Sequence, residues 1–399
     1  MKPLAKRVSK IKPSPTLVIT AKAKALKAQG LDVIGFGAGE PDFDTPANIK
    51  AAAIKAINDG QTKYTAVEGI VELRKAIQAK LKNDNNLDYG LDEILVSAGG
   101  KHSLYNIAQV LFNEGDEVII PAPYWVSYPD QVLLNDATPV AVLATDATGF
   151  KITPAQLEKA ITAKTKAIYL NSPSNPTGAA YSREELLAIG EVCVKHDLYI
   201  ISDEIYEKVI YDGFTHVSIA ALSPALKERT LVVNGASKVY SMTGWRMGFT
   251  AGPKNIIKSM TEVQGQVTSN ISSITQFASL EAYTGSQEAI TKMVSAFKER
   301  RDYIVEALNT IPGIRCAKPQ GAFYVFPNIS ALLGKKTPKG KVLTNDDEFC
   351  AHLLDDHLVA IVAGGGFGAP GFVRLSYATS MDAIKKGVER LKKAVSELS

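Results

Sequence analysis

The sequence has few cysteines and no long hydrophobic run, and each shortage excludes a class of protein. No apolar stretch approaches the roughly 18 residues that cross a bilayer, so we expect no membrane association. A net charge of only +4 gives no reason to expect nucleic acid as a partner. The five histidines form no metal-ligand motif, and no metal is expected. The only cysteines are Cys193, Cys316 and Cys350. An odd number of widely spaced cysteines indicates reduced thiols and a cytoplasmic location.

Length and composition are those of a globular protein with room for more than one hydrophobic core. Of the 399 residues, 46% are hydrophobic and 22% are charged. A chain of this length usually divides into two or more domains. We find no internal repeats, low-complexity tracts or linkers rich in glycine and serine.

The first 31 residues are strongly basic. They carry eight lysines and arginines before the first acidic residue, Asp32. A transit peptide has such a composition, and so has a basic arm. We favour an arm over residues 1–13 and a helix that begins near Ser14, because the apolar residues that follow recur at helical spacing.

The middle of the chain alternates between helical and strand patterns, which is typical of an α/β domain with a mainly parallel sheet. The sequence predicts a helix over 46–59 and seven strands, over 94–97, 117–120, 139–144, 167–171, 198–202, 230–233 and 247–251. Near residue 285 the pattern changes to long charged helices and few strands. We therefore predict a large domain over 46–285 and a smaller α/β domain made of 14–45 and 286–399. In open α/β sheets, ligands bind beyond the carboxyl ends of the strands.

Lys238 follows one of these strands and lies among small residues, in the stretch Asn234-Gly-Ala-Ser-Lys238. A lysine held in a tight pocket loses affinity for its proton, and the neutral amine can condense with an aldehyde. Arg246, eight residues later, can bind an anionic group of the same ligand. An aldehyde that carries such a group is pyridoxal phosphate. The alternative is that Lys238 is one of many solvated lysines.

Two glycines after the first predicted strand of the sheet form a second candidate site. Gly99 and Gly100 stand between the strand 94–97 and a helical pattern, where backbone N–H groups can bind a phosphate. Glycine pairs also occur in ordinary turns. Trp125, one of only two tryptophans, follows the next strand and either stacks on a flat ring or packs in a core.

Three later strands carry polar residues that suit the same ligand. Prolines near Asn175 would fix the direction of its amide. Asp203 and Tyr206 follow the strand 198–202, where a carboxylate needs a cationic partner such as a protonated pyridine nitrogen. Arg374 lies in the middle of a strand and could bind a carboxylate. The structural alternatives are an Asp203 that caps a turn or pairs with an arginine, and an Arg374 on an exposed face.

Together these segments resemble the class I aminotransferases of the fold type I pyridoxal-phosphate enzymes, and most closely the bacterial-type aspartate aminotransferases. The resemblance covers nearly the whole chain, and its motifs occur in the same order and spacing. The motifs are Ala38-Gly-Glu-Pro-Asp-Phe43, Tyr64, Gly99-Gly-Lys101, Tyr124-Trp125, Asn175-Pro-Thr-Gly178, Ser202-Asp-Glu-Ile-Tyr206, Ser237-Lys238, Thr243-Gly-Trp-Arg246, Gly321-Ala-Phe-Tyr324 and Arg374-Leu-Ser-Tyr377.

The resemblance implies a fold type I structure, pyridoxal 5′-phosphate as cofactor and a homodimer with shared sites. It implies that Lys238, Asp203 and Tyr206 are catalytic, with Lys238 linked covalently to the cofactor. The other implied cofactor contacts are Gly99, Gly100, Lys101, Trp125, Asn175, Ser237, Arg246 and, from the second subunit, Tyr64. The implied substrate contacts are Gly39, Lys101, Trp125, Asn175 and Arg374.

The implied reaction is a reversible, ping-pong transfer of the amino group between L-aspartate or L-glutamate and a 2-oxo acid, either oxaloacetate or 2-oxoglutarate. Animal-type aspartate aminotransferases bind the distal carboxylate with an arginine of the partner subunit, and residues 264–270 offer no clear counterpart. In the bacterial-type branch a lysine stands at the position of Lys101, and we expect Lys101 to supply this cation.

Lys12 points to a further substrate. A branch of the family with dual aspartate and prephenate activity carries a lysine in this setting, which implies conversion of prephenate to arogenate. The alternative is that Lys12 is one more solvated charge in a basic arm. Two other activities stay open on the same residues, namely an aminotransferase for aromatic or neutral amino acids and a pyridoxal-phosphate lyase of the same fold.

Overall fold

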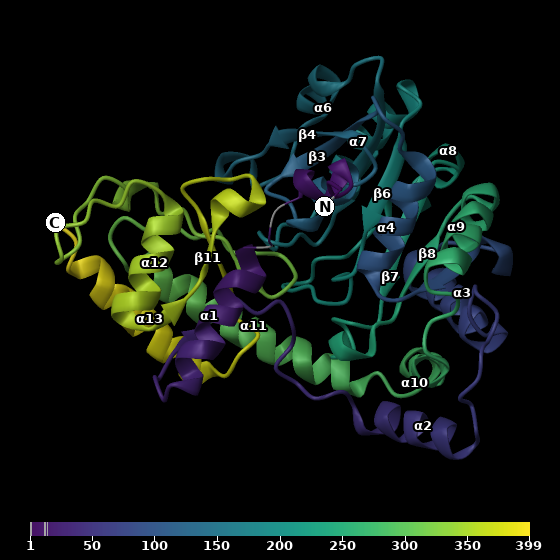
Figure 1. Ribbon diagram of the computed structural model, residues 1–399, viewed down its shortest axis with the longest axis horizontal. Coiled ribbons are helices and arrows are strands. Elements are labelled where there is room, and N and C mark those ends of the chain that lie inside the picture. The colour runs from purple at the N-terminus through teal and green to yellow at the C-terminus, as the bar shows by residue number, and fades with distance from the viewer. Residues whose placement is uncertain (1, 12, 14) are drawn as a thin grey trace.

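A seven-stranded sheet forms the centre of the molecule in a computed structural model that describes residues 2–11, 13 and 15–399 (Figure 1). In spatial order its strands are β2 (Ile94–Ser97), β8 (Gly248–Ala251), β7 (Thr230–Gly235), β6 (Tyr199–Asp203), β5 (Thr165–Asn171), β3 (Glu117–Ala122) and β4 (Thr138–Leu143). Only β8 runs antiparallel to its neighbours within this sheet. The predicted, mainly parallel sheet is confirmed, and each predicted strand overlaps one of these seven.

Helices cover both faces of this sheet, because consecutive strand residues point to opposite sides. In β7, for example, Leu231 and Val233 pack against one set of helices while Val232 packs against the other. One face is covered by α4 (Gly100–Leu111), α5 (Ser127–Leu133) and α9 (Lys254–Val267). The other is covered by α3 (Val71–Asn85), α6 (Pro154–Ala160), α7 (Arg183–Lys195), α8 (Pro224–Lys227) and α10 (Ser273–Thr284), with α2 (Ala47–Asn58) beside α10.

A second group of elements combines the two ends of the chain, as Figure 1 shows to the left of the large sheet. Its strands are β1 (Ile34–Gly35), β9 (Tyr324–Val325), β10 (Val359–Ala360), β11 (Val362–Ala363) and β12 (Val373–Ser376). Its helices are α1 (Pro15–Ala28), α11 (Glu288–Asn309), α12 (Asp346–His357) and α13 (Met381–Ser396). β1 pairs in parallel with β10, so the N-terminal segment is held by residues more than 300 positions away.

Short 3₁₀ helices occupy several connections. They are η1 (Lys6–Lys10), η2 (Leu91–Glu93), η3 (Asp146–Thr148), η4 (Ile219–Ala221), η5 (Thr243–Trp245), η6 (Ser330–Leu332) and η7 (Gly364–Phe367). The first of them belongs to the basic arm and reaches the large sheet, where the Lys10 ammonium pairs with Asp136 at 2.6 Å. Lys12 and Ser14, both named in the sequence predictions, lie outside the described residues.

The connections at the carboxyl ends of the parallel strands bring the predicted site residues to one edge of the sheet. β2 leads to Gly99, β3 to Trp125 and β5 to Asn175, while β6 ends at Asp203 and β7 leads to Lys238. In the part of the chain that the structure describes, no helix combines the length and the apolar character needed to cross a membrane.

Candidate active site

A cavity of about 310 Å³ lies at this edge of the sheet, closed on its far side by β12 and the N-terminal segment. Eleven of the fourteen predicted site residues line it. They are Gly39, Gly100, Lys101, Trp125, Asn175, Asp203, Tyr206, Ser237, Lys238, Arg246 and Arg374. Of the remaining three, Gly99 adjoins the cavity through its contact with Arg246, whereas Tyr64 and Lys12 are treated below.

Lys238 places in this cavity an amine whose pKa is lower than usual. It lies in the turn that follows β7, and its Nζ donates a hydrogen bond to the Gly39 carbonyl oxygen at 2.5 Å. Burial lowers the pKa of the Lys238 ammonium to about 8, and the positive charges of Arg246 and Arg374 act in the same direction. A neutral, unhindered amine can attack an aldehyde and can also carry a proton.

Asp203 ends β6 as a buried carboxyl group that holds its proton more tightly than usual. Its Oδ2 accepts a hydrogen bond from the Tyr128 hydroxyl at 2.7 Å, and its Oδ1 accepts one from the Ile205 amide at 3.2 Å. Neither partner is a cation. Burial therefore raises the pKa of Asp203 to about 6 despite these hydrogen bonds. The turn-capping role considered for Asp203 is present, and the same carboxylate still faces the cavity without a full counter-charge.

Gly99 and Gly100 form a narrow turn at the N-terminus of α4, close to the guanidinium of Arg246. Gly99 has a φ of +88°, and a Cβ at this position would lie 2.7 Å from Arg246 Nη2. Gly100 lines the cavity and is the first residue of a 12-residue helix, where backbone N–H groups have no partner within the helix. Helix N–H groups beside a guanidinium suit a phosphate or another small anion.

Arg374 approaches from β12 and is 2% exposed, so the alternative of an exposed strand face is wrong. Its Nη1 donates to Asn175 Oδ1 at 2.9 Å and its Nη2 donates to the Gly37 carbonyl oxygen at 2.8 Å. Among the described residues, its buried Nε has no hydrogen-bond partner. Beside it, the hydroxyl groups of Tyr206 and Tyr324 lie 2.9 Å apart. This arrangement can bind a carboxylate because a guanidinium donor is still available there.

Trp125 and Lys101 form another wall of the cavity. The Lys101 Nζ lies 4.8 Å from the centre of the Trp125 ring, and that ring meets Tyr128 edge-on at 5.4 Å. Partial burial and the charge of Arg246 lower the pKa of the Lys101 ammonium. Lys101 thus lines the same cavity as the guanidinium groups of Arg246 and Arg374.

Tyr64 is the predicted site residue that the fold keeps away from this cavity. Its side chain is 90% exposed on the loop between α2 and α3. A second, wider cavity of about 840 Å³ opens on the other side of Arg246 and is lined by Trp245, Asn270 and Ile271 among others.

Sequence reasoning missed two tyrosines that complete the cavity. Tyr128 holds Asp203, and Tyr324 contacts both the Tyr206 hydroxyl and, through its ring, Arg374. Tyr324 was noted only as part of a motif. One sequence feature could have indicated Tyr128, because it stands three residues after Trp125, near the start of a helix. Both residues line the same cavity.

Comparison with known proteins agrees with this geometry. Residues 31–391 match the family described as Aminotransferase class I and II. The chain belongs to the class I and II aminotransferases. The "Aspartate aminotransferase" of Geobacillus stearothermophilus is 56% identical over 97% of this chain and 98% of its own length. The "Aspartate/prephenate aminotransferase" of Cereibacter sphaeroides is 50% identical over 99% of each chain.

Solved structures of other aminotransferases share the whole fold. The aspartate aminotransferase of Rhizobium meliloti superimposes with a TM-score of 0.97 at 48% identity, over 100% of both chains. The aspartate aminotransferase of Thermus thermophilus with maleate has a TM-score of 0.93 at 42% identity, over 99% of this chain and 100% of that one.

Class I and II aminotransferases depend on pyridoxal 5′-phosphate, which is therefore the cofactor of this chain. The residues of the cavity fit this group at three separate points. An amine of lowered pKa suits its aldehyde, a buried carboxylate suits its ring nitrogen, and the Gly99 turn with Arg246 suits its phosphate. These three features come from different strands, and the cavity brings them together.

Proposed function

We propose that this aminotransferase transfers the amino group reversibly between L-aspartate or L-glutamate and a 2-oxo acid, oxaloacetate or 2-oxoglutarate, in a ping-pong cycle. The observation that carries the proposal is a single cavity that contains the Lys238 amine and three further cations, of which Arg246 lies beside the Gly99 turn and Lys101 and Arg374 remain for the substrate. An amino acid with two carboxylates matches two cations better than a neutral or aromatic one does. The names of the relatives support the same substrate.

In this proposal, Lys238 is the group that binds the cofactor aldehyde and later moves a proton. Bound pyridoxal phosphate supplies an electron sink for the bonds at the substrate α-carbon. Lys238 Nζ, which donates a hydrogen bond to the Gly39 carbonyl oxygen and has a lowered pKa, takes the α-proton and returns it as general base and acid. Asp203 keeps the ring nitrogen protonated, with Tyr128 holding the carboxylate in place.

The remaining contacts of the cofactor and the substrate follow from the walls of the cavity. For the cofactor we propose ring contacts from Trp125, Asn175 and Tyr206, and phosphate contacts from Gly99, Gly100, Ser237 and Arg246, with Lys101 beside them. For the substrate we propose that Arg374 and Gly39 bind the α-carboxylate, between Trp125 and Asn175. Lys101 then binds the side-chain carboxylate. The Thermus thermophilus enzyme was solved with maleate, which is also a four-carbon dicarboxylate.

The absorption spectrum of the purified protein tests this function. We expect a visible band from the bound cofactor, and we expect L-aspartate to convert it to the band of the amine form with release of oxaloacetate. L-Phenylalanine and L-alanine serve as aromatic and neutral comparisons. A faster conversion by either would favour the open alternative of an aromatic or neutral aminotransferase. Release of ammonia or loss of a side-chain fragment would identify a lyase.

We also propose a homodimer in which Tyr64 completes the phosphate site of the partner. The loop that carries Tyr64 is held at its base by two fully buried amides. Gln276 Nε2 donates to Thr65 Oγ1 at 3.0 Å, and Gln264 Nε2 donates to the Val67 carbonyl oxygen at 3.1 Å. A 90% exposed tyrosine on a loop fixed in this way is suited to reach a neighbouring subunit.

A hybrid dimer tests the shared site. Lys238→Ala and Tyr64→Ala subunits, each of low activity alone, are mixed, dissociated and reassociated. One site of the hybrid then has both native residues, so we expect activity to return. Hybrid dimers without recovered activity would contradict the shared site, and sedimentation of the wild type as a monomer would contradict the dimer.

Prephenate is a second proposed substrate, favoured by relatives that are named aspartate/prephenate aminotransferases. Lys12 is the residue we assign to it, on the arm that η1 attaches to the large sheet. Comparison of kcat/KM for prephenate and oxaloacetate in the wild type and in Lys12→Gly tests this assignment. We expect the variant to lose prephenate activity selectively. A wild type inactive on prephenate, or an equal loss for both substrates, would exclude it.

We further propose the domain division and the location that the sequence predicted. The large domain is 46–285, and the small domain is 14–45 with 286–399, preceded by an arm over 1–13. A cytoplasmic location is supported by three free cysteines that are all buried and unpaired.

A further inference from the structure

The turn after β6 carries acidic residues on both of its sides. Asp203 and Tyr206 line the cavity, whereas Glu204 and Glu207 point away from it into the protein. Glu204 is 1% exposed and Glu207 is 4% exposed. Two buried carboxylates directly behind the proposed cofactor residues need an explanation, because charged groups are rarely buried without a compensating interaction.

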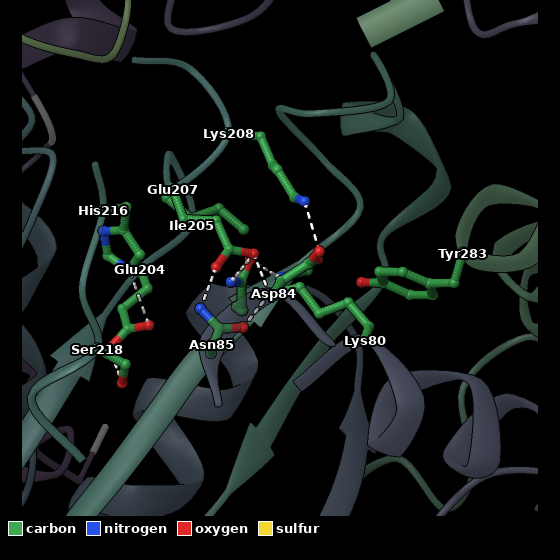
Figure 2. Close-up of polar contacts among 12 residues, drawn as sticks. Lys80, Asp84, Asn85, Glu204, Ile205, Glu207, Lys208, His216, Ser218 and Tyr283 are labelled. Atoms are coloured by element: carbon green, nitrogen blue, oxygen red, sulfur yellow. Dashed lines mark hydrogen bonds and ion pairs between the residues drawn. The ribbon is translucent and has the colours of Figure 1, made fainter. Parts of the chain in front are cut away.

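Glu204 is held by three side chains, as Figure 2 shows in part. Its Oε1 accepts hydrogen bonds from the hydroxyls of Ser218 at 2.7 Å and Ser202 at 2.8 Å. Its Oε2 lies 3.1 Å from His216 Nε2. Burial lowers the pKa of His216, but the hydrogen bond and charge of the Glu204 carboxylate raise it by more, so the net shift of the pKa is upward and favours the positively charged imidazole.

Glu207 is held by three other side chains, from α3 and β7. Its Oε1 pairs with the Lys80 ammonium and accepts a hydrogen bond from Asn234 Nδ2 at 2.8 Å. Its Oε2 accepts one from Asn85 Nδ2 at 2.7 Å (Figure 2). Asn234 belongs to the strand that leads to Lys238 four residues later. Glu207 thus connects the turn that carries Asp203 to the strand that presents the amine.

Glu204, Glu207 and His216 bring three potential metal ligands within 4.8 Å of one another. Their oxygen atoms, however, already receive hydrogen bonds from serine, asparagine and histidine, and the Lys80 ammonium occupies the position beside Glu207. The two carboxylates thus face the Lys80 ammonium and the His216 ring. Fully satisfied ion networks of this kind fix one conformation of a backbone more than they add to stability.

We propose that Glu204 and Glu207 are positioning residues that hold the turn carrying Asp203 and Tyr206 in the geometry that binds the cofactor. The proposal rests on the cofactor roles proposed above for those two residues. Glu204 fixes the start of the turn against the segment of His216 and Ser218, and Glu207 fixes its end against α3 and β7. Glu204 and Glu207 share this short turn with Asp203 and Tyr206. Holding the two glutamates on the inner side therefore also fixes the two residues that line the cavity.

Cofactor affinity of the apoprotein tests the proposal without relying on turnover. The dissociation constant of pyridoxal phosphate is measured at 10 °C for wild type, Glu204→Gln and Glu207→Gln, alongside the unfolding temperature of each apoprotein. We expect the constant to rise about tenfold in both variants, which corresponds to about 1.4 kcal/mol. A purely structural role would lower the unfolding temperature and leave the constant of the folded protein unchanged, and that result would overturn the proposal.

Three further variants make the result specific. Asp84→Asn removes a carboxylate that pairs with Lys208 at 2.8 Å on the outer side of the same network, and we expect its dissociation constant to stay within twofold of wild type. An equal loss in Asp84→Asn would overturn the proposal. If either glutamine variant fails to fold, Ser218→Ala removes one donor to Glu204 with little loss of volume, and we expect a rise of about threefold. An unchanged constant in Ser218→Ala would count against positioning.

Asp203→Asn separates this proposal from the proposed function. If Asp203→Asn weakens cofactor binding and the glutamate variants do not, only the positioning roles are wrong. If Asp203→Asn itself leaves the constant unchanged, the cofactor role of Asp203 is wrong and the positioning proposal falls with it.

Discussion

The two sides of the turn after β6 shift the pKa of a buried carboxyl group in opposite directions. On the cavity side, Asp203 has a hydroxyl and an amide as hydrogen-bond partners, and its pKa is raised to about 6. On the inner side, Glu207 has the Lys80 ammonium and two asparagine amides, and its pKa is lowered to about 2. Both are buried to a similar extent, with exposed fractions of 6% for Asp203 and 4% for Glu207, so burial cannot explain the difference. Glu207 forms an ion pair with the Lys80 ammonium, whereas Asp203 forms none with the described residues. The cavity leaves space for a cation that belongs to a ligand.

The same contrast applies to the two enclosed lysines. Lys80 lies against Glu207 and Asp84, whereas Lys238 lies against a backbone carbonyl and near two arginines. Glu207 and Lys80 on the inner side pair with opposite charges of the protein. On the cavity side, the pKa values of Asp203 and Lys238 are shifted towards the neutral form of each group, as those of catalytic groups commonly are. Four experiments test or refine this contrast.

The largest effect is expected from the cavity lysine. Lys238→Ala should abolish transamination, since general acid–base catalysis alone contributes roughly 10²–10⁴-fold and the covalent link is lost as well. Turnover is measured by a coupled assay for oxaloacetate. Lys208→Ala is the control, because Lys208 pairs with Asp84 outside the cavity, and it should keep its activity within about twofold. Near-normal turnover in Lys238→Ala would refute the assignment.

The next effect is a loss of stability on the inner side. Glu207→Gln leaves the Lys80 ammonium with Asn85 Oδ1 at 2.6 Å and with the more distant carboxylate of Asp84 at 3.8 Å. We expect the free energy of unfolding to fall by about 3 kcal/mol at pH 7, because the close ion pair is lost. Because the folded pKa of Glu207 lies below its ordinary value of 4.5, its stabilisation is complete above pH 4.5 and is lost as the pH falls towards 2. Denaturant unfolding at pH 7 and pH 3 should show a smaller difference between variant and wild type at the lower pH.

Lys101→Ser tests the second cation of the cavity. We expect KM for aspartate to rise by the equivalent of about 1.5–3 kcal/mol, because a charged hydrogen bond to the side-chain carboxylate is lost. KM for an uncharged amino acid should change much less. Steady-state kinetics with both substrates decide the matter, and equal losses would mean that Lys101 only supports the phosphate.

The smallest effect is a gain of stability on the cavity side. Asp203→Asn should inactivate the enzyme and yet stabilise the apoprotein by about 1–3 kcal/mol at pH 8, since the buried charge is removed. The folded pKa of about 6 exceeds the ordinary 3.8, so the cost of ionising Asp203 appears as the pH rises from about 4 to 6. The gain should therefore vanish below pH 4. A loss of stability at pH 8 would show that Asp203 is structurally paired after all.

The local sequence pattern was sufficient to predict the helices and strands, as two cases illustrate. The run 94–97 was predicted as a strand because it is short, apolar and followed by two glycines, and β2 has those same bounds. Long charged helices are predicted from near residue 285, and α11 spans Glu288–Asn309. Both signals are contained within a few neighbouring residues, so no tertiary information was needed.

The partners of each charged side chain could not be predicted in this way. Asp203 and Glu207 stand four residues apart on the same acidic turn, and nothing local distinguishes them. Their different proton affinities depend on Tyr128, Lys80 and Asn234, which come from three other elements of the fold. Arg374 likewise had an exposed-face alternative until β12 was seen to be buried.

The sequence by itself determined the seven strands, the order of the motifs and the family to which they belong, because strand periodicity and loop residues are properties of neighbouring positions. Only the tertiary structure decided which carboxylates and amines are neutralised by the protein and which face an open cavity. Electrostatic free energy depends on distance and burial in space, and the fold brings together residues that are far apart in the chain, such as Asn175 and Arg374, 199 positions apart.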